Sequence, residues 1–200
     1  VASNQEGTRE LKEIFGDLLF DNPKPTGLLK FLLELGVDKN SVVLDFFSGS
    51  STTAHAVMQL NAEDGGNRKF IMVQLPEPTD EKTEAHKAGY MNICEIGKER
   101  IRRAGERIKE EKGLEAMNLD VGFKVLKLDS SNIRKWQPDY NDLEQSLMDY
   151  VDNYVEGRTE FDVVYEIMLF FASENSSLLQ NFFPRHQWGI FMLTPVVLPA

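Results

Sequence analysis

Residues 42–53 read VVLDFFSGSSTT, and this stretch decides the fold that we expect. Its first six residues are apolar apart from Asp45, a composition typical of a strand that is buried on both faces of a parallel sheet. Its last six residues are small and mostly polar, and they lead into a segment of helical composition, 54–60. We therefore predict a buried strand, a tight loop and a helix, in that order.

A second apolar strand follows the helix. Gly65-Gly66-Asn67 predicts a turn, and residues 70–75, which read FIMVQL, predict a strand of the same buried type. Parallel neighbours are usually joined by a crossover through a helix, and the hand of that crossover is almost always right. The segment therefore predicts a βαβ unit, and the chain an α/β fold.

Patterning predicts further elements on both sides of this unit. Thr26 is placed to cap a helix that Gly36 closes. The helix predicted over 90–112 carries mixed charges that favour a solvated face, with DNA contact as the alternative. We have no functional account of the apolar tail after Ser173. The predicted helices cover 3–18, 26–35, 90–112, 142–155 and 159–172, and a third strand covers 123–128.

Composition limits the possible functions. The 200 residues are 42% hydrophobic and 27% charged, as in ordinary globular proteins. A net charge of −10 makes the chain a poor candidate to bind DNA by itself, because binding to phosphate depends on Lys and Arg. The single cysteine, Cys94, permits no internal disulfide, so we expect a cytoplasmic location. No run of about 18 apolar residues predicts a membrane span.

The loop after the first strand is the predicted ligand site. Ligands of open α/β sheets bind at the carboxyl ends of the strands. Small residues let the backbone approach a ligand closely, and free amides at a helix start favour a carboxylate or a phosphate. The residues alone therefore predict a small anionic or nucleoside-like ligand. The spacings of a nucleotide P-loop and of a dinucleotide fold do not occur here.

Two segments carry a resemblance to a known family. The run from Asp45 to Thr53 resembles the Asp-x-Phe-x-Gly-Ser-Gly-Thr-Thr cofactor motif of amino-group DNA methyltransferases. The segment from Phe20 to Pro25 resembles the motif that precedes it in their beta class. Further segments are similar to the modification subunit of type III restriction systems, and the resemblance covers about Ser3 to Leu169. These segments are 61–70, 74–77, 98–103 and 127–136.

The resemblance implies a fold and an activity. The implied fold is α/β, a partial S-adenosylmethionine-dependent methyltransferase (Rossmann-like) sheet with helices, incomplete without an amino-terminal half. Residues 1–136 would form the S-adenosylmethionine-binding part, and 137–200 a helical carboxy-terminal extension. The implied activity of the full-length enzyme is site-specific methylation of adenine N6 in DNA. Adenine rather than cytosine follows from the resemblance alone.

The same resemblance assigns the cofactor-binding residues. The loop 48–53 would wrap the methionine part of S-adenosylmethionine, with Asp45 near its amino group. Gln74 holds the place near the ribose hydroxyls, and Glu77 is a nearby substitute. Ser51 stands where the family has glycine, which crowds the cofactor or changes a backbone dihedral. The complete predicted set is Lys24, Thr26, Asp45, Phe47, Ser48, Gly49, Ser50, Ser51, Thr52 and Gln74.

The sequence contains no Asp-Pro-Pro-Tyr type motif, which would hold the flipped target base. We assign no catalytic residue, interpret 137–140 (QPDY) as an ordinary turn, and expect the chain alone to be inactive. The three histidines lack metal-ligand spacing, so no metal site is predicted.

The implied partners are DNA, through a missing amino-terminal region, and a restriction endonuclease subunit. We expect the exposed edge of the first strand to be hidden by homodimerisation or by the tail refolding across it.

Other interpretations remain open at this stage. Asp45 can simply hold the loop after its strand, and Thr52 and Thr53 can cap the next helix. The chain can be a non-catalytic assembly module whose helices after Asp139 dock a partner. A nucleotide-dependent enzyme on the same βαβ unit is a third interpretation.

Overall fold

The computed structural model describes residues 4–116, 119–174 and 187–193. The chain divides into two compact units, one formed by Val1–Leu128 and Arg185–Ala200 and the other by Asp129–Pro184. This division falls after Leu128 rather than after residue 136, and it returns the end of the chain to the first unit. The functions assigned to 1–136 and 137–200 stay predictions.

The first unit is a parallel sheet covered by helices. The strand order is β1-β2-β4-β3, and each neighbouring pair is parallel. Val42 pairs with Lys69 and Asp45 with Met72, so the predicted βαβ unit of β1, α3 and β2 is present. The elements of this unit are α1 (Asn4–Phe15), α2 (Thr26–Gly36), β1 (Val42–Asp45), α3 (Thr52–Asp64), β2 (Lys69–Gln74), α4 (Glu84–Lys87), α5 (Ile93–Lys112), the 3-10 helix η1 (Gly113–Ala116), β3 (Phe123–Leu128) and β4 (Gln187–Leu193).

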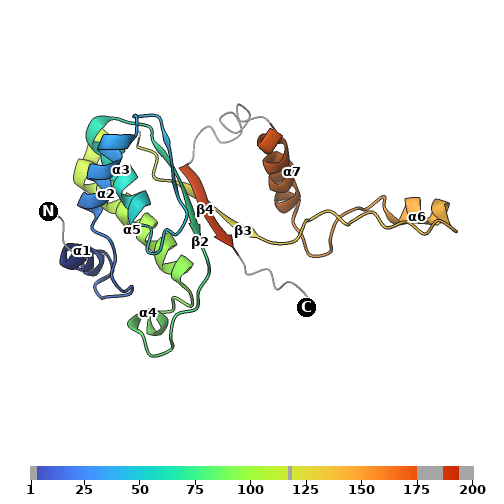
Figure 1. Cartoon of the computed structure of the whole chain (residues 1–200), viewed down its shortest axis with the longest axis horizontal. Helices are drawn as coiled ribbons and strands as arrows, with labels where there is room; N and C mark the ends of the chain where they lie inside the picture. The colour runs from blue at the N-terminus through green and yellow to red at the C-terminus, as the bar shows by residue number, and fades with distance from the viewer. Residues whose placement is uncertain (1–3, 117–118, 175–186, 194–200) are drawn as a thin grey trace. The chain divides into compact units, whose positions relative to one another are not determined.

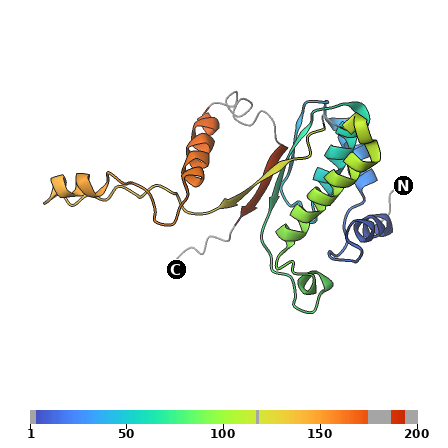
Figure 2. The ribbon, with the colours of Figure 1, turned by 180° about the vertical axis from the view of Figure 1, so that it is seen from behind.

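Helices α2, α3 and α5 cover one face of this sheet (Figures 1 and 2). The side chains that alternate toward the helices form the core, and Val43, Phe70 and Met72 are its strand members. Val42 and Leu44 point the other way and are 51% and 60% exposed. The prediction that this strand is buried on both faces is therefore wrong, because the described helices of the unit lie against only one face.

Strand β4 changes the predicted sheet. We expected three strands, and β4 is a fourth, formed by part of the apolar tail to which we assign no function from the sequence. It pairs with β2 on the side away from β1, with Met72 opposite Ile190. The described part of the tail, residues 187–193, does not cover the edge of β1 as predicted, because it pairs with β2 and β3; the rest of the tail lies outside the described residues. The alternative, homodimerisation, stays a prediction.

Helices α2 and α3 begin without the predicted threonine caps. Pro25 is the N-cap of α2, and Thr26 is its first helical residue. The N-cap of α3 is Ser51, in the left-handed conformation, and neither helix has a side-chain cap hydrogen bond. Thr26, Thr52 and Thr53 direct their hydroxyls to other partners, described below, so the prediction of a Thr26 cap is wrong.

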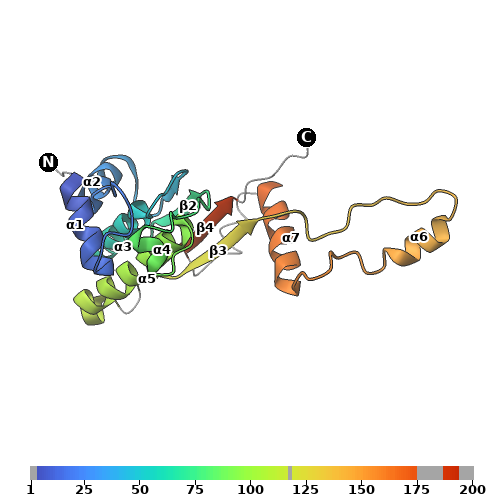
Figure 3. The ribbon, with the colours of Figure 1, turned by 90° about the horizontal axis from the view of Figure 1, so that it is seen from below.

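The second unit contains α6 (Leu143–Asp149) and α7 (Glu160–Glu174). Figure 3 shows the chain running out to α6 and back to α7 in two extended segments, which an antiparallel bridge joins between Ile133 and Tyr154. The helix predicted over 142–155 is shorter than expected and ends at Asp149. Residues 137–140 lie before α6, and the amide of Asp142 donates to the carbonyl of Asp139, so the turn begins at Asp139, two residues later than predicted.

No helix in the described part of the chain is both long enough and apolar enough to cross a membrane.

Candidate cofactor-binding site

The loop between β1 and α3 is held to the neighbouring strand. The amide of Ser48 donates to the carbonyl of Val73 at 3.1 Å. The amide of Gly49 donates to Oε1 of Gln74 at 2.8 Å. Gln74, at the end of β2, also donates from Nε2 to the carbonyl of Leu75 at 3.2 Å. The structure thus brings Gln74 to the loop, where both ends of its amide are engaged by the chain itself.

Asp45 fixes the two ends of the loop. Its Oδ1 accepts from the amide of Phe47 at 3.3 Å, and its Oδ2 accepts from the hydroxyl of Thr53. The simple role that we considered for Asp45, holding the loop after its strand, is therefore present in the structure. These bonds also keep its carboxylate at the carboxyl end of β1, where the predicted cofactor role requires it.

Ser51 keeps the backbone conformation that glycine favours. Its φ is 60° and its ψ is 39°, in the left-handed region, and Gly49 has a φ of 50°. A non-glycine residue in this region costs about 1–2 kcal/mol. The two expected effects of serine at this position, a crowded cofactor or a changed dihedral, stay predictions. The added side chain points toward α5, where a Cβ at Gly97 would lie 2.6 Å from Ser51 Oγ.

The segment from Phe20 to Pro25, called the upstream motif below, contacts the same loop through the ring of Phe20. A Cβ on Gly49 would lie 3.1 Å from Cζ of Phe20, so the ring packs directly on the glycine. Pro23 and Pro25 are fully buried, and the absence of a side chain at Gly7 lets α1 contact the backbone of this segment. Lys24 and Phe47 are exposed, and no described contact joins either side chain to the loop.

Arg100 joins the loop to the upstream motif. Its Nη1 donates to Ser50 Oγ at 3.0 Å and to Thr52 Oγ1 at 2.7 Å. Its Nη2 donates to Thr26 Oγ1 at 3.3 Å, and the side chain is 0% exposed. The prediction of a solvated face on α5 is therefore wrong for Arg100, although Arg102 and Arg103 form the expected local pairs with Glu99.

Sequence reasoning missed Arg100, but a signal for it exists. It lies on the stripe of α5 that also carries Gly97, Ala104 and Ile108, all of them buried. An arginine on an apolar stripe is more informative than one on a charged face, because burying its charge requires hydrogen-bond partners. A count of the charges on this helix does not show which face each of them occupies.

Two hydroxyls of the loop have no partner among the described residues. Ser48 Oγ and Ser51 Oγ are both buried and make no hydrogen bond. Buried polar groups are nearly always paired, so an unpaired hydroxyl needs an explanation such as a water or a ligand. Small residues and spare donors fit the methionine end of S-adenosylmethionine, whose carboxylate accepts hydrogen bonds.

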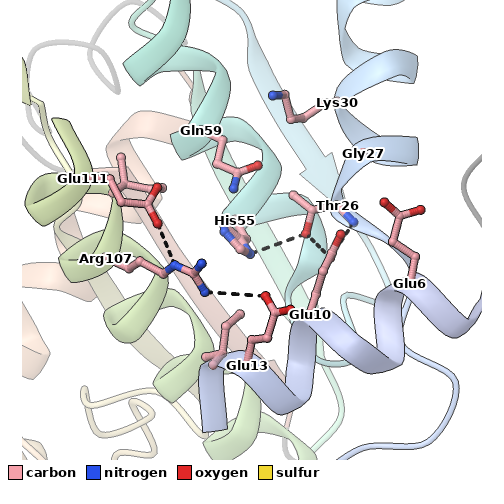
Figure 4. Close-up of a pocket in the computed structure, with 12 residues that line it drawn as sticks. Glu6, Glu10, Glu13, Thr26, Gly27, Lys30, His55, Gln59, Arg107 and Glu111 are labelled. Carbon is pink, nitrogen blue, oxygen red and sulfur yellow. Dashed lines mark hydrogen bonds and ion pairs between the residues drawn. The ribbon is translucent and has the colours of Figure 1, made fainter. Parts of the chain in front are cut away.

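A cavity of about 240 Å³ lies on the helical side of the unit. Figure 4 shows Glu10 of α1, Thr26 of α2 and His55 of α3 converging there, and Thr26 Oγ1 lies 3.5 Å from His55 Nδ1. Thr26 is the one predicted site residue in its lining. The lining residues are Glu6, Glu10, Glu13, Ile14, Thr26, Gly27, Lys30, His55, Gln59, Arg107, Ile108 and Glu111.

His55 is uncharged in this environment. Burial is the main cause that lowers its pKa from 6.5 to about 3, and the positive charge of Arg100 adds to it. A neutral imidazole beside Thr26 is consistent with a packed core histidine.

Comparison with known protein families finds one family model that matches the chain. A family model described as DNA methylase matches residues 2–106, which is more than half of the 200 residues. The chain belongs to this DNA methylase family. The matched range contains both segments that resemble cofactor motifs and extends into α5, so it includes the residues that Arg100 connects.

Similar proteins include subunits of restriction enzymes. The chain is 53% identical to the type III restriction-modification enzyme StyLTI Mod subunit of Salmonella typhimurium over 124 residues, which is 62% of this chain and 19% of that protein. It is 42% identical to the EcoPI Mod subunit of Escherichia phage P1 over the same shares. The type II methyltransferase M.KpnI of Klebsiella pneumoniae is 37% identical over 92 residues, 46% of this chain and 22% of that protein.

These findings confirm the resemblance to DNA methyltransferases and to type III modification subunits. The aligned part of the chain spans about a fifth of each of these relatives. The assignment to the beta class and the roles of the individual site residues stay predictions.

Proposed function

We propose that this chain is the S-adenosylmethionine-binding part of a site-specific DNA adenine-N6 methyltransferase of a type III restriction-modification system. Membership of the DNA methylase family and the similarity to Mod subunits support this proposal. S-adenosylmethionine would supply the methyl group of that reaction. The role of this chain is to bind the cofactor, orient it and exclude water around its methionine end.

The observation that carries the proposal is the convergence of the two cofactor motifs. Phe20 packs on Gly49, and Thr26 shares the guanidinium of Arg100 with Ser50 and Thr52. The unpaired hydroxyl of Ser48 adds a buried hydrogen-bonding group to the loop that would receive the cofactor.

In this proposal the chain alone does not transfer a methyl group. The 200 residues contain no Asp-Pro-Pro-Tyr type motif, so another segment of a longer protein would hold the target base. DNA binding would also lie outside this chain. Residues 129–184 contain eleven acidic and three basic residues, which disfavours contact with phosphate. A restriction endonuclease subunit is the proposed protein partner.

The open edge of β1 is the proposed contact between two copies of the isolated chain. Among the described strands, β1 pairs with β2 alone, and Leu44 is 60% exposed. An apolar edge strand can pair with another chain through its free backbone groups. In a full-length enzyme, a strand from the rest of the methyltransferase domain would take this place.

Calorimetry tests the cofactor assignment. Titration of S-adenosylmethionine into the chain should give saturable heat, and Asp45→Ala should abolish it, because the loop loses both of its bonds to this carboxylate. Asp38→Ala is the matched control, since Asp38 is exposed and its carboxylate makes no described contact. Absence of heat at millimolar cofactor would contradict the proposal.

The second unit favours one other function, a non-catalytic assembly module. Leu143 and Leu147 lie one helical turn apart on α6, Val151 follows just after the helix ends, and the three are 48%, 57% and 80% exposed. Such a stripe suits a partner protein. This alternative is supported if the chain gives no heat with S-adenosylmethionine, yet assembles with a restriction subunit in a manner that Leu147→Asp abolishes.

A further inference from the structure

Arg100 contacts both segments that carry the cofactor motifs, although it belongs to neither. Its guanidinium donates to Ser50 and Thr52 on one side and to Thr26 on the other. The first pair lies at the start of α3 and Thr26 at the start of α2. One planar group therefore sets the spacing between two helix starts that come from separate parts of the sequence.

The charge of Arg100 is balanced by α1. Glu10 Oε2 lies 3.8 Å from Nη2, and the same oxygen accepts from the amide of Thr26 at 2.9 Å and from its hydroxyl at 2.6 Å. The hydroxyl of Thr26 thus donates to Glu10 and accepts from Arg100. Burial lowers the pKa of Arg100 to about 10, so the side chain is still charged at neutral pH.

Gly97 brings Arg100 within reach of the loop. A Cβ at this position would lie 3.2 Å from the carbonyl oxygen of Gly49 as well as meeting Ser51 Oγ. The missing side chain allows α5 to approach the loop backbone, and Arg100 follows one helical turn later. The close approach of α5 to the loop and the buried guanidinium of Arg100 are therefore two features of the same face of α5.

We propose that Arg100 is the positioning residue of the cofactor pocket. It holds the loop 48–52 and the start of α2 in one arrangement, and cofactor affinity depends on that arrangement although Arg100 does not touch the cofactor. The identity of the cofactor rests on the proposed function. The link between the two segments rests on the hydrogen bonds of Arg100. A planar fork is required, because an ammonium is a single point from which three separate hydroxyls cannot be reached equally.

The test compares Arg100→Lys with Arg102→Lys in the full chain. Arg102 lies on the same helix, is half exposed and pairs with Glu99. Arg100→Lys should weaken S-adenosylmethionine binding by about tenfold or more, which corresponds to the loss of one charge-assisted hydrogen bond. Hydrogen exchange of the cofactor-free protein should rise in 48–53 and 24–28 together, and should not rise in either segment of Arg102→Lys.

A chemical rescue separates positioning from general stability. Millimolar methylguanidinium should restore cofactor affinity to Arg100→Ala, and methylammonium should not, because only the former reproduces the fork. Wild-type affinity and exchange in Arg100→Lys would overturn the proposal. If exchange rises in both segments but the wild-type chain does not bind S-adenosylmethionine, the link made by Arg100 is supported and the proposed function is refuted.

Discussion

Gly97 of α5 faces Ser51 of the loop so closely that a Cβ on the glycine would lie 2.6 Å from the serine Oγ. The two residues are complementary in size. Serine occupies the loop position where the resembling motif has glycine, and a glycine occupies the facing position on the helix. The space left by the missing side chain at Gly97 accommodates the side chain of Ser51.

Gly97→Ala should therefore lower both stability and cofactor affinity. The new methyl group would push Ser51 away, and overpacking of this kind costs about 1–3 kcal/mol. Part of this cost is offset, because alanine favours a helix over glycine by about 1 kcal/mol. Urea unfolding and calorimetry with S-adenosylmethionine measure the two effects.

The double variant Gly97→Ala with Ser51→Gly should recover most of what the single variant loses. Removing the serine side chain removes the closer of the two contacts of the new methyl group, leaves the Gly49 carbonyl oxygen at 3.2 Å, and relieves the left-handed strain at residue 51. Gly27→Ala is a control for glycine replacement in a helix, because a Cβ at Gly27 in α2 would meet nothing within 4 Å. Equal losses in the single and double variants would show that the contact between the two residues is not the cause.

His55 should make the protein less stable as the pH falls. Its folded pKa of about 3 lies below the unfolded value of 6.5, so only the unfolded chain binds a proton at this site between these values. The free energy of unfolding should fall by up to about 1.4 kcal/mol per pH unit as the pH drops below 6.5. His55→Gln should flatten this slope between pH 6.5 and 5 in urea unfolding, and His86→Gln should not. Parallel slopes in all three proteins would refute the role of His55.

Leu44→Lys should dissociate the proposed dimer of the isolated chain. Leu44 is 60% exposed on the edge strand, and a lysine there would place like charges against each other between two copies. Light scattering coupled to size exclusion measures the mass. Leu114→Lys is the control, since Leu114 is 85% exposed in η1. A monomeric wild-type chain would rule out the dimer.

Cys94 should be unreactive in the native protein. It is 1% exposed and donates to the carbonyl of Gln74, and burial raises its pKa to about 11 from 9.0. The reactive thiolate is therefore about a hundredfold rarer than in an ordinary cysteine at the same pH. A disulfide reagent should label the chain slowly at pH 8 and rapidly in urea. Rapid labelling without urea would contradict this assignment.

The βαβ unit was predictable because its signals are local. The apolar runs at 42–47 and 70–75, with turn chemistry at 65–67, predicted β1, α3 and β2 to within a few residues. Strand β3 was predicted with its observed ends, Phe123 and Leu128. The degree of burial was not predictable in the same way, since Leu44 looks the same in a sequence whether or not a neighbour covers it.

The contacts that organise the site are long-range, and the sequence does not encode them in any single segment. Arg100 lies 74 positions from Thr26 and 50 from Ser50. Family resemblance identified the threonine and the serine but not the arginine between them. Strand β4 escaped prediction for a similar reason, because its place in the sheet depends on a free edge of β2 far away in the sequence.

The position of β4 between β2 and β3 has a consequence for how the chain folds during synthesis. The segment that separates β3 from β4 in sequence includes the whole second unit, so β2 and β3 emerge from the ribosome long before the strand that joins them. Until residues 187–193 have been made, each of these two strands has an uncovered edge, and strand pairing over such separations is slow. The nascent chain should therefore depend on chaperones most during the translation of its second unit.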